Sequence, residues 1–139
     1  MTEHDLERAA KPLLLGAAPQ LFVADLPLSC DFFCKELGFT IEFTYGEPPF
    51  YGQVARDGAR LALRQIDRPA LAGINAAMAA EPDMLAASIT VDNVGALYLE
   101  FKAAGAPFHQ ALRSEPWGAR TFIVRDPDGN LLLFAGSAD

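Results

Sequence analysis

The amino-acid sequence predicts an α+β fold built from two copies of one βαβββ module. The main observation is an internal repeat: Asp25 and Asp92 each end a short strand-like run, and they lie 67 positions apart. The turn-forming pairs Asp57–Gly58 and Asp128–Gly129 lie 71 positions apart, and each precedes an apolar run. A drift from 67 to 71 is expected if the second copy contains loop insertions. The repeat therefore favours one domain of two modules over two separate domains.

The first module is expected to begin with a strand and a helix. Leu21 and Val23 alternate with Gln20 and Phe22, which is the period-2 pattern of a strand. Pro27 suits the first turn of the helix. Apolar residues then recur at helical spacing, and a glycine suited to a C-cap follows them: Cys30, Phe33, Leu37 and Gly38. Three strands complete the module, near residues 39–45, 50–56 and 59–65.

The second module is expected to repeat this order. A strand near residues 86–92 precedes a helix near 94–104, and Asp92 between them is a suitable N-cap. Strands follow near residues 107–113, 117–125 and 130–135. The domain organisation is an N-terminal arm at 1–16 and a single domain at 17–136, with module one at about 17–66, a linker helix at about 69–81 and module two at about 86–136.

Composition narrows the range of functions. The chain has 139 residues and a net charge of −7, which disfavours binding to a nucleic-acid backbone. No run approaches the ~20 apolar residues that span a bilayer, and the N-terminus lacks a signal-peptide pattern. Cys30 and Cys34 lie at i,i+4, and we expect them to be reduced thiols on one helix. These features predict a cytoplasmic protein that binds neither nucleic acid nor membranes.

Four short motifs occur in the order found in one known superfamily. They are Val23–Leu26 (Val-Ala-Asp-Leu), Phe32–Phe33, Leu37–Phe39 (Leu-Gly-Phe) and Arg125–Asn130 (Arg-Asp-Pro-Asp-Gly-Asn). Together with the paired modules, they make residues 17–136 resemble the vicinal oxygen chelate (VOC) superfamily. That superfamily contains glyoxalase I, extradiol dioxygenases, fosfomycin-resistance enzymes and bleomycin-resistance proteins. The resemblance implies a cup-shaped sheet that encloses a ligand, with helices covering its outer face.

The last strand is informative under this resemblance. Leu131–Ala135 has no polar residue on either face, whereas a half-exposed strand should alternate. The resemblance implies that one side of this strand faces the helices and the other lines the cavity.

Enzymes of the superfamily hold a divalent metal with His, Glu or Gln at four cup-facing strand positions. Alignment on the repeat places these positions at Ala18, Ala62, Ala86 and Leu133, none of which can bind a metal. A register shift of two residues reaches Gln20 and Ser88, which are weak ligands. The resemblance thus implies no metal and no other cofactor.

Within the superfamily, the chain is most similar to the bleomycin-resistance proteins. The block from Pro116 to Asn130 carries that similarity, along with the short spacing from Asp25 to Phe32–Phe33. The resemblance implies a homodimer that sequesters an aromatic or cationic small molecule, as in antibiotic resistance, without catalysis. The alternative is an enzyme of the same superfamily, a lyase, isomerase or dioxygenase whose active site is degenerate or unrecognised.

Candidate ligand-binding residues come from the expected cup face and its rim. Aromatic rings offer stacking and cation–π surfaces, arginines bind anionic groups, and a few polar groups orient a ligand. The candidates are Gln20, Phe22, Phe50, Tyr51, Arg64, Ser88, Thr90, Trp117, Arg120 and Leu133. The competing interpretation is that the aromatic residues only pack within the protein and that the arginines are only solvated at strand ends. His109 is the candidate catalytic base, with a purely structural role as the alternative.

Overall fold

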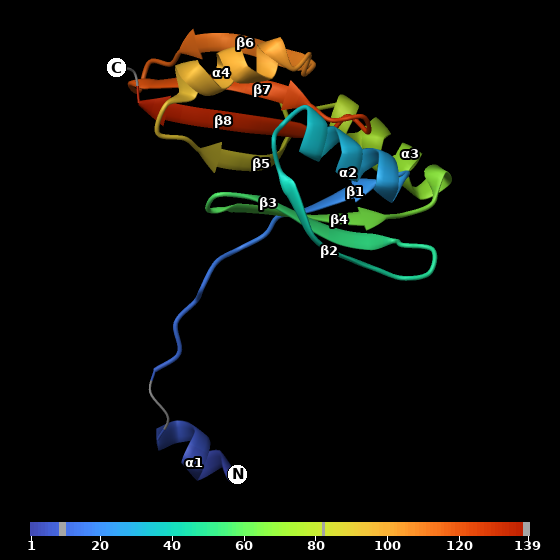
Figure 1. Ribbon diagram of the computed structural model, residues 1–139, viewed down its shortest axis with the longest axis vertical. Coiled ribbons are helices and arrows are strands. Elements are labelled where there is room, and N and C mark those ends of the chain that lie inside the picture. The colour runs from blue at the N-terminus through green and yellow to red at the C-terminus, as the bar shows by residue number, and fades with distance from the viewer. Residues whose placement is uncertain (9–10, 82, 138–139) are drawn as a thin grey trace.

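The computed structural model describes residues 1–8, 11–81 and 83–137, and it contains two four-stranded sheets with helices (Figure 1). The first sheet contains β1 (Gln20–Val23), β2 (Thr40–Tyr45), β3 (Tyr51–Arg56) and β4 (Ala59–Gln65). The second contains β5 (Leu85–Thr90), β6 (Phe108–Ser114), β7 (Ala119–Arg125) and β8 (Leu131–Ser137). Helix α2 (Leu26–Lys35) follows β1, and α4 (Val94–Ala103) follows β5. The prediction of an α+β fold with two βαβββ modules is confirmed.

The two sheets have the same topology. Their strand orders are β1-β4-β3-β2 and β5-β8-β7-β6, with one parallel pair in each and antiparallel pairs elsewhere. In the parallel pairs Gln20 lies opposite Ala62, and Ser88 lies opposite Leu133. Gln20 and Ser88 are therefore equivalent positions of the two modules, 68 residues apart.

The helix caps correct one prediction. Asp25 caps α2 through its side chain, which accepts from the Leu28 N–H, and Pro27 lies in the first turn as expected. In the second module the cap of α4 is Asn93, whose side chain accepts from the Ala96 N–H, and not Asp92. The expected repeat offset of 67 was one residue too short at this point, since Asn93 lies 68 positions after Asp25. Asp92 is therefore not used as a cap.

The core joins both modules. Each helix covers one face of its own sheet, α2 against β2, β3 and β4, and α4 against β7 and β8. Phe33, Phe101 and Phe122 are fully buried members of a single hydrophobic cluster. Leu132 and Phe134 of β8 belong to this cluster, which confirms that one side of the last strand faces the helices. We call the opposite face of each sheet its open face.

Two further segments lie outside the modules. Helix α3 (Arg68–Ala79) connects the first sheet to the second, as expected of the 69–81 segment. Helix α1 (Glu3–Arg8) lies at the end of an N-terminal arm that extends away from both sheets (Figure 1). The leucines at 13, 14 and 15 are almost fully exposed in this arm. No helix in the described part of the chain has the length and hydrophobicity needed to cross a bilayer.

A turn of the second module holds the end of β1. The Asp128 carboxylate accepts from the Ala24 N–H at 3.2 Å, and the Asn130 side-chain amide donates to the Phe22 carbonyl at 3.1 Å. Asp126 organises the turn, because its carboxylate accepts from the backbone N–H groups of Asp128 (2.9 Å) and Asn130 (2.7 Å). We call Asp126, Asp128 and Asn130 the clasp. It fixes one end of the junction between the modules.

Candidate functional site

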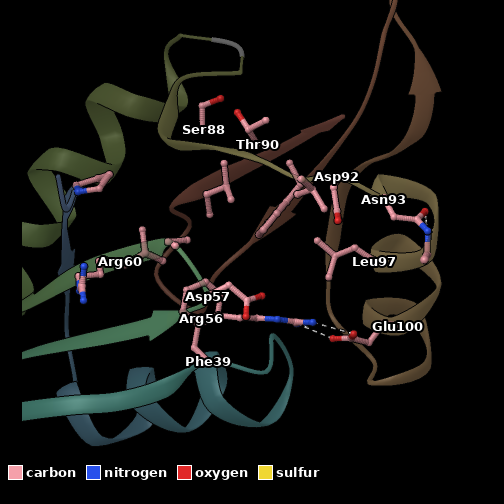
Figure 2. A pocket seen from close by; sticks show the side chains of 18 of the residues that line it. Phe39, Arg56, Asp57, Arg60, Ser88, Thr90, Asp92, Asn93, Leu97 and Glu100 are labelled. Carbon is pink, nitrogen blue, oxygen red and sulfur yellow. Dashed lines mark hydrogen bonds and ion pairs between the residues drawn. The ribbon is translucent and has the colours of Figure 1, made fainter. Parts of the chain in front are cut away.

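A cleft of about 910 Å³ lies at the other end of this junction (Figure 2). One wall is the β3–β4 hairpin, residues 56–61, with residues 17 and 19 beside it. The opposite wall is the end of β5 and the first turns of α4, residues 88–93, 96, 97 and 100. This volume is within the range of pockets that bind small molecules. The cleft therefore lies between modules that are held together by the clasp at their other end.

The inner surface of the cleft is apolar. Phe39, Ile89, Leu97 and Phe134 contribute to it, and Phe39 and Phe134 are almost fully buried. Phe134 comes from the apolar strand β8, so that strand reaches the cleft through its core-facing side. Aromatic and aliphatic surfaces of this kind gain free energy when a ligand displaces water from them. The cleft can hold the apolar body of a ligand.

An ion pair crosses the cleft from one module to the other. Arg56 of β3 donates two hydrogen bonds to Glu100 of α4, with N···O distances of 2.7 and 3.0 Å, and a third to the Leu37 carbonyl at 2.9 Å. The hydrogen bond from Arg56 lowers the pKa of Glu100, and the same bond raises the pKa of Arg56. Both side chains are therefore charged at neutral pH. The pair is a bidentate bridge beneath the cleft (Figure 2).

The remaining charges of the cleft are unbalanced. Arg60 bonds Glu42 on the open face, with an N···O distance of 3.0 Å. Within residues 1–8, 11–81 and 83–137, neither Asp57 nor Asp92 forms an ion pair or a side-chain hydrogen bond, and the two come from opposite walls of the cleft (Figure 2). Asp57 also has a φ of 51°, which is uncommon for a residue other than glycine. With both arginines paired, two carboxylates remain to attract a cationic group.

The predicted site residues separate into three groups. Ser88 and Thr90 line the cleft. Gln20, Phe22, Tyr51 and Arg64 lie on β1, β3 and β4, and the register aligns Tyr51, Arg64 and Phe22 across three neighbouring strands. The Arg64 guanidinium lies 5.9 Å from the centroid of the Phe50 ring. Leu133 lies opposite Ser88 on β8. The open face of the first sheet therefore collects five of the predicted residues away from the cleft.

Trp117 and Arg120 lie elsewhere. Trp117 is in the turn between β6 and β7, is 75% exposed, and is not among the residues that line the cleft. Arg120 shares its side of β7 with the buried Phe122, and its guanidinium lies beside Gly95 of α4. Arg120 is therefore on the helix-covered side of the second sheet and not on its open face.

The imidazole ring of His109 lies between two hydrogen-bond partners, Arg125 and Asp83. Arg125 can only donate, so the Nδ1 atom of His109 accepts its hydrogen bond at 2.8 Å. The Nε2 atom must then carry the proton, which it donates to Asp83 at 2.9 Å. Both ring nitrogens of the neutral imidazole are engaged. This arrangement favours the structural role for His109 over the role of a catalytic base.

Comparison with known proteins identifies the family. Residues 16–134 match the model of the Glyoxalase/Bleomycin resistance protein/Dioxygenase superfamily. The chain belongs to this superfamily. Bleomycin resistance proteins of Staphylococcus aureus (strain MRSA252) and Geobacillus stearothermophilus are each 29% identical to it over 132 residues, covering 87% of this chain and 96% of theirs.

Two solved structures have the same fold. A bleomycin-binding protein from Streptomyces verticillus, solved with copper(II)-bleomycin, is 26% identical with a TM-score of 0.70, covering 91% of this chain and 99% of that one. TioX from Micromonospora sp. ML1 is 20% identical with a TM-score of 0.68, covering 88% and 98%. The paired βαβββ fold of the superfamily is thus confirmed for this chain.

The positions at which superfamily enzymes bind metal have no donors here. They are Ala18, Ala62, Ala86 and Leu133, and the register places Gln20 beside Ala62 and Ser88 beside Leu133. In the described ranges, no group of three or more His, Cys, Asp or Glu side chains is arranged to hold a metal ion. These residues do not fit the metal site that catalytic members of the superfamily use.

Four charged residues of the cleft were not predicted from the sequence: Arg56, Asp57, Asp92 and Glu100. Asp57 was interpreted only as part of a turn, and Asp92 only as a cap. The sequence did contain one usable signal, which is the Asp92-Asn93 pair. Because only one of these two residues can cap α4, the other carboxylate or amide is free for another role.

Proposed function

We propose that this member of the superfamily is a metal-free binding protein for small organic cations with an apolar or aromatic body. The observation that carries the proposal is the cleft, which combines an apolar inner surface with the carboxylates of Asp57 and Asp92. Both residues are exposed, so they attract a cation at the mouth of the cleft, while the apolar inner surface of the cleft holds the body of the ligand. The cleft would exclude anions, because Arg56 and Arg60 are already paired.

The relatives support the same class of ligand. Bleomycin resistance proteins share 29% of their residues with this chain, and the Streptomyces verticillus neighbour was solved with copper(II)-bleomycin. Sequestration of a drug-like cation, as in antibiotic resistance, is therefore the biological role we propose. The engagement of both His109 ring nitrogens supports binding over catalysis.

Isothermal titration calorimetry with 2-phenylethylammonium and with bleomycin tests this proposal. The Asp57→Asn/Asp92→Asn variant is expected to bind 2-phenylethylammonium at least about tenfold more weakly than the wild type, a loss of ~1.4 kcal/mol. Asp31→Asn is the matched control, because it removes an exposed carboxylate from α2 that does not line the cleft. Wild-type protein that binds neither compound would contradict the proposal. So would a double variant with unchanged affinity.

We further propose that the protein is a homodimer. The edge strand β2 is exposed at all six positions, and Ile41, Phe43 and Tyr45 are between 44% and 66% exposed. Exposed apolar strand edges are usually covered by another chain, and a two-fold dimer is the commonest arrangement. Light scattering should give twice the chain mass of 15.0 kDa, and a monomer mass would contradict this.

The compartment that we propose is the cytoplasm. Cys30 and Cys34 are free thiols on α2, as expected from the sequence. Burial raises the pKa of both thiols, which keeps them protonated and unreactive. Free cysteines of this kind are typical of proteins in a reducing compartment.

A further inference from the structure

The two ends of the junction between the modules are equivalent by the internal repeat. The clasp turn of the second module lies against the end of β1, where Asn130 and Asp128 contact Phe22 and Ala24. The equivalent turn of the first module, at Asp57–Gly58, lines the cleft together with the end of β5. Asp57 corresponds to Asp128 and Ala59 to Asn130, each 71 positions apart. The cleft thus occupies the place that a second clasp would fill.

The residues that close the clasp are missing from the first module. Asn130 is replaced by Ala59, which has no amide to donate. The register equates Val54 with Val124, and therefore Arg56 with Asp126, so the first module also lacks the carboxylate that organises the turn. Without these contacts Asp57 does not reach the backbone of Asp92, as Asp128 reaches that of Ala24. With Ala59 and Arg56 at these positions, the first module has no side-chain amide to close the cleft and no carboxylate to organise its turn.

A backbone acceptor is left in the open cleft. Successive carbonyls of an edge strand alternate between the neighbouring strand and the free edge. The Val91 N–H bonds the Ala135 carbonyl on β8, so Thr90 presents its backbone groups to the edge, as Phe22 does. In the described ranges no side chain donates to the Thr90 carbonyl, whereas the Phe22 carbonyl accepts from Asn130. Thr90 is an exposed residue, so water reaches its carbonyl, and a ligand that covers this carbonyl must supply a donor in place of the water.

We infer that the ligand of the cleft takes the place of the missing asparagine side chain. Its N–H group donates to the Thr90 carbonyl, its positive charge is balanced by Asp57 and Asp92, and its apolar body packs on Phe39 and Phe134. The ligand class is therefore a primary or secondary ammonium, or an amidinium, and not a quaternary ammonium. This inference rests on the proposed function and specifies the chemistry of the same site.

Two ligands that differ only in N–H groups test the chemistry. Trimethyl(2-phenylethyl)ammonium has the charge and ring of 2-phenylethylammonium but no N–H to donate. We expect it to bind at least about tenfold more weakly, because a site built around a hydrogen bond rejects an analogue that lacks it. Equal affinity for the two compounds would overturn the inference while leaving the proposed cation site intact.

Two isosteric variants test the missing clasp. Ala59→Asn supplies the amide that module one lacks, so it should close the cleft, weaken 2-phenylethylammonium binding at least about tenfold and raise the melting temperature. Ala59→Asp introduces a side chain of the same size as Asn that cannot donate. It should keep or raise the affinity, because it adds a carboxylate to the cleft, and it should leave the melting temperature unraised. Loss of binding in both variants would show only steric blocking and would overturn the inference. If the wild type binds neither ammonium compound, the proposed function fails. Equal melting temperatures for Ala59→Asn and Ala59→Asp would separately overturn the inference that the first module lacks a clasp.

Discussion

Removal of the clasp amide should destabilise the protein even though Asn130 lies in a turn. Asn130 is 7% exposed, and its amide donates to the Phe22 carbonyl and to the Asp126 carboxylate at 3.1 and 2.9 Å. Asn130→Ala loses both hydrogen bonds, at about 1 kcal/mol each, and leaves a buried carboxylate oxygen without that donor, at roughly 1–3 kcal/mol. We therefore expect the free energy of unfolding to fall by about 3 kcal/mol.

Urea titration followed by far-UV circular dichroism measures this loss. For a chain of this length, the expected entropy of unfolding converts a loss of 3 kcal/mol into a fall of about 10 °C in the melting temperature. Gln110→Ala is the matched control, because its amide bonds only Thr121 on the neighbouring strand of the same sheet. The control loses two hydrogen bonds at about 1 kcal/mol each but no donor to a buried carboxylate, so it should lose about 2 kcal/mol. If Asn130→Ala is no less stable than Gln110→Ala, the clasp does not hold the modules together.

Three further outcomes are expected. Burial raises the pKa of Asp126 to about 6, so the native state keeps this proton to a higher pH than the unfolded chain does. The free energy of unfolding should therefore fall as pH rises from about 4 to 6, by at most about 3 kcal/mol. Asp126→Asn should flatten that part of the pH profile measured by urea titration. Glu100→Gln should lower the free energy of unfolding by about 1 kcal/mol at low salt and by less in 1 M NaCl, because the bridge to Arg56 is partly exposed and salt screens it. An equal loss at both salt concentrations would argue against an electrostatic bridge. Ile41→Lys should weaken dimerisation measured by sedimentation equilibrium with little change in the urea midpoint, because Ile41 is 49% exposed on the edge strand β2. An unchanged dimer would remove β2 from the interface.

The modules could be predicted from the sequence because their signals are local. Strand alternation at Leu21 and Val23, Pro27 in a first turn and paired Asp-Gly turns each depend on a few neighbouring residues. Gly38 and Gly105 end their helices with φ of 73° and 81°, which only glycine adopts readily. These features fix the order and approximate bounds of the strands without knowledge of tertiary contacts.

The site was less accessible to prediction, because it depends on contacts between residues far apart in the sequence. Arg56 and Glu100 meet across the module junction, and no periodic pattern marks that pairing. An error of one residue in the repeat offset assigned the cap to Asp92 and concealed its free carboxylate. The sequence correctly placed Arg120 on a strand. Alternation alone did not establish which face of that strand it occupies, because this depends on the burial of Phe122.

The most direct test of the cleft is a chemical-shift titration of ¹⁵N-labelled protein with 2-phenylethylammonium. The backbone amides of Asp57, Thr90 and Leu97 should shift progressively and saturate together, because these residues line the two walls of the cleft. The amides of Phe43 and Trp117 should change little, since neither residue lines it. Shifts confined to Phe43, Trp117 and their neighbours would contradict binding in the cleft and would indicate that the ligand binds on the open faces of the sheets.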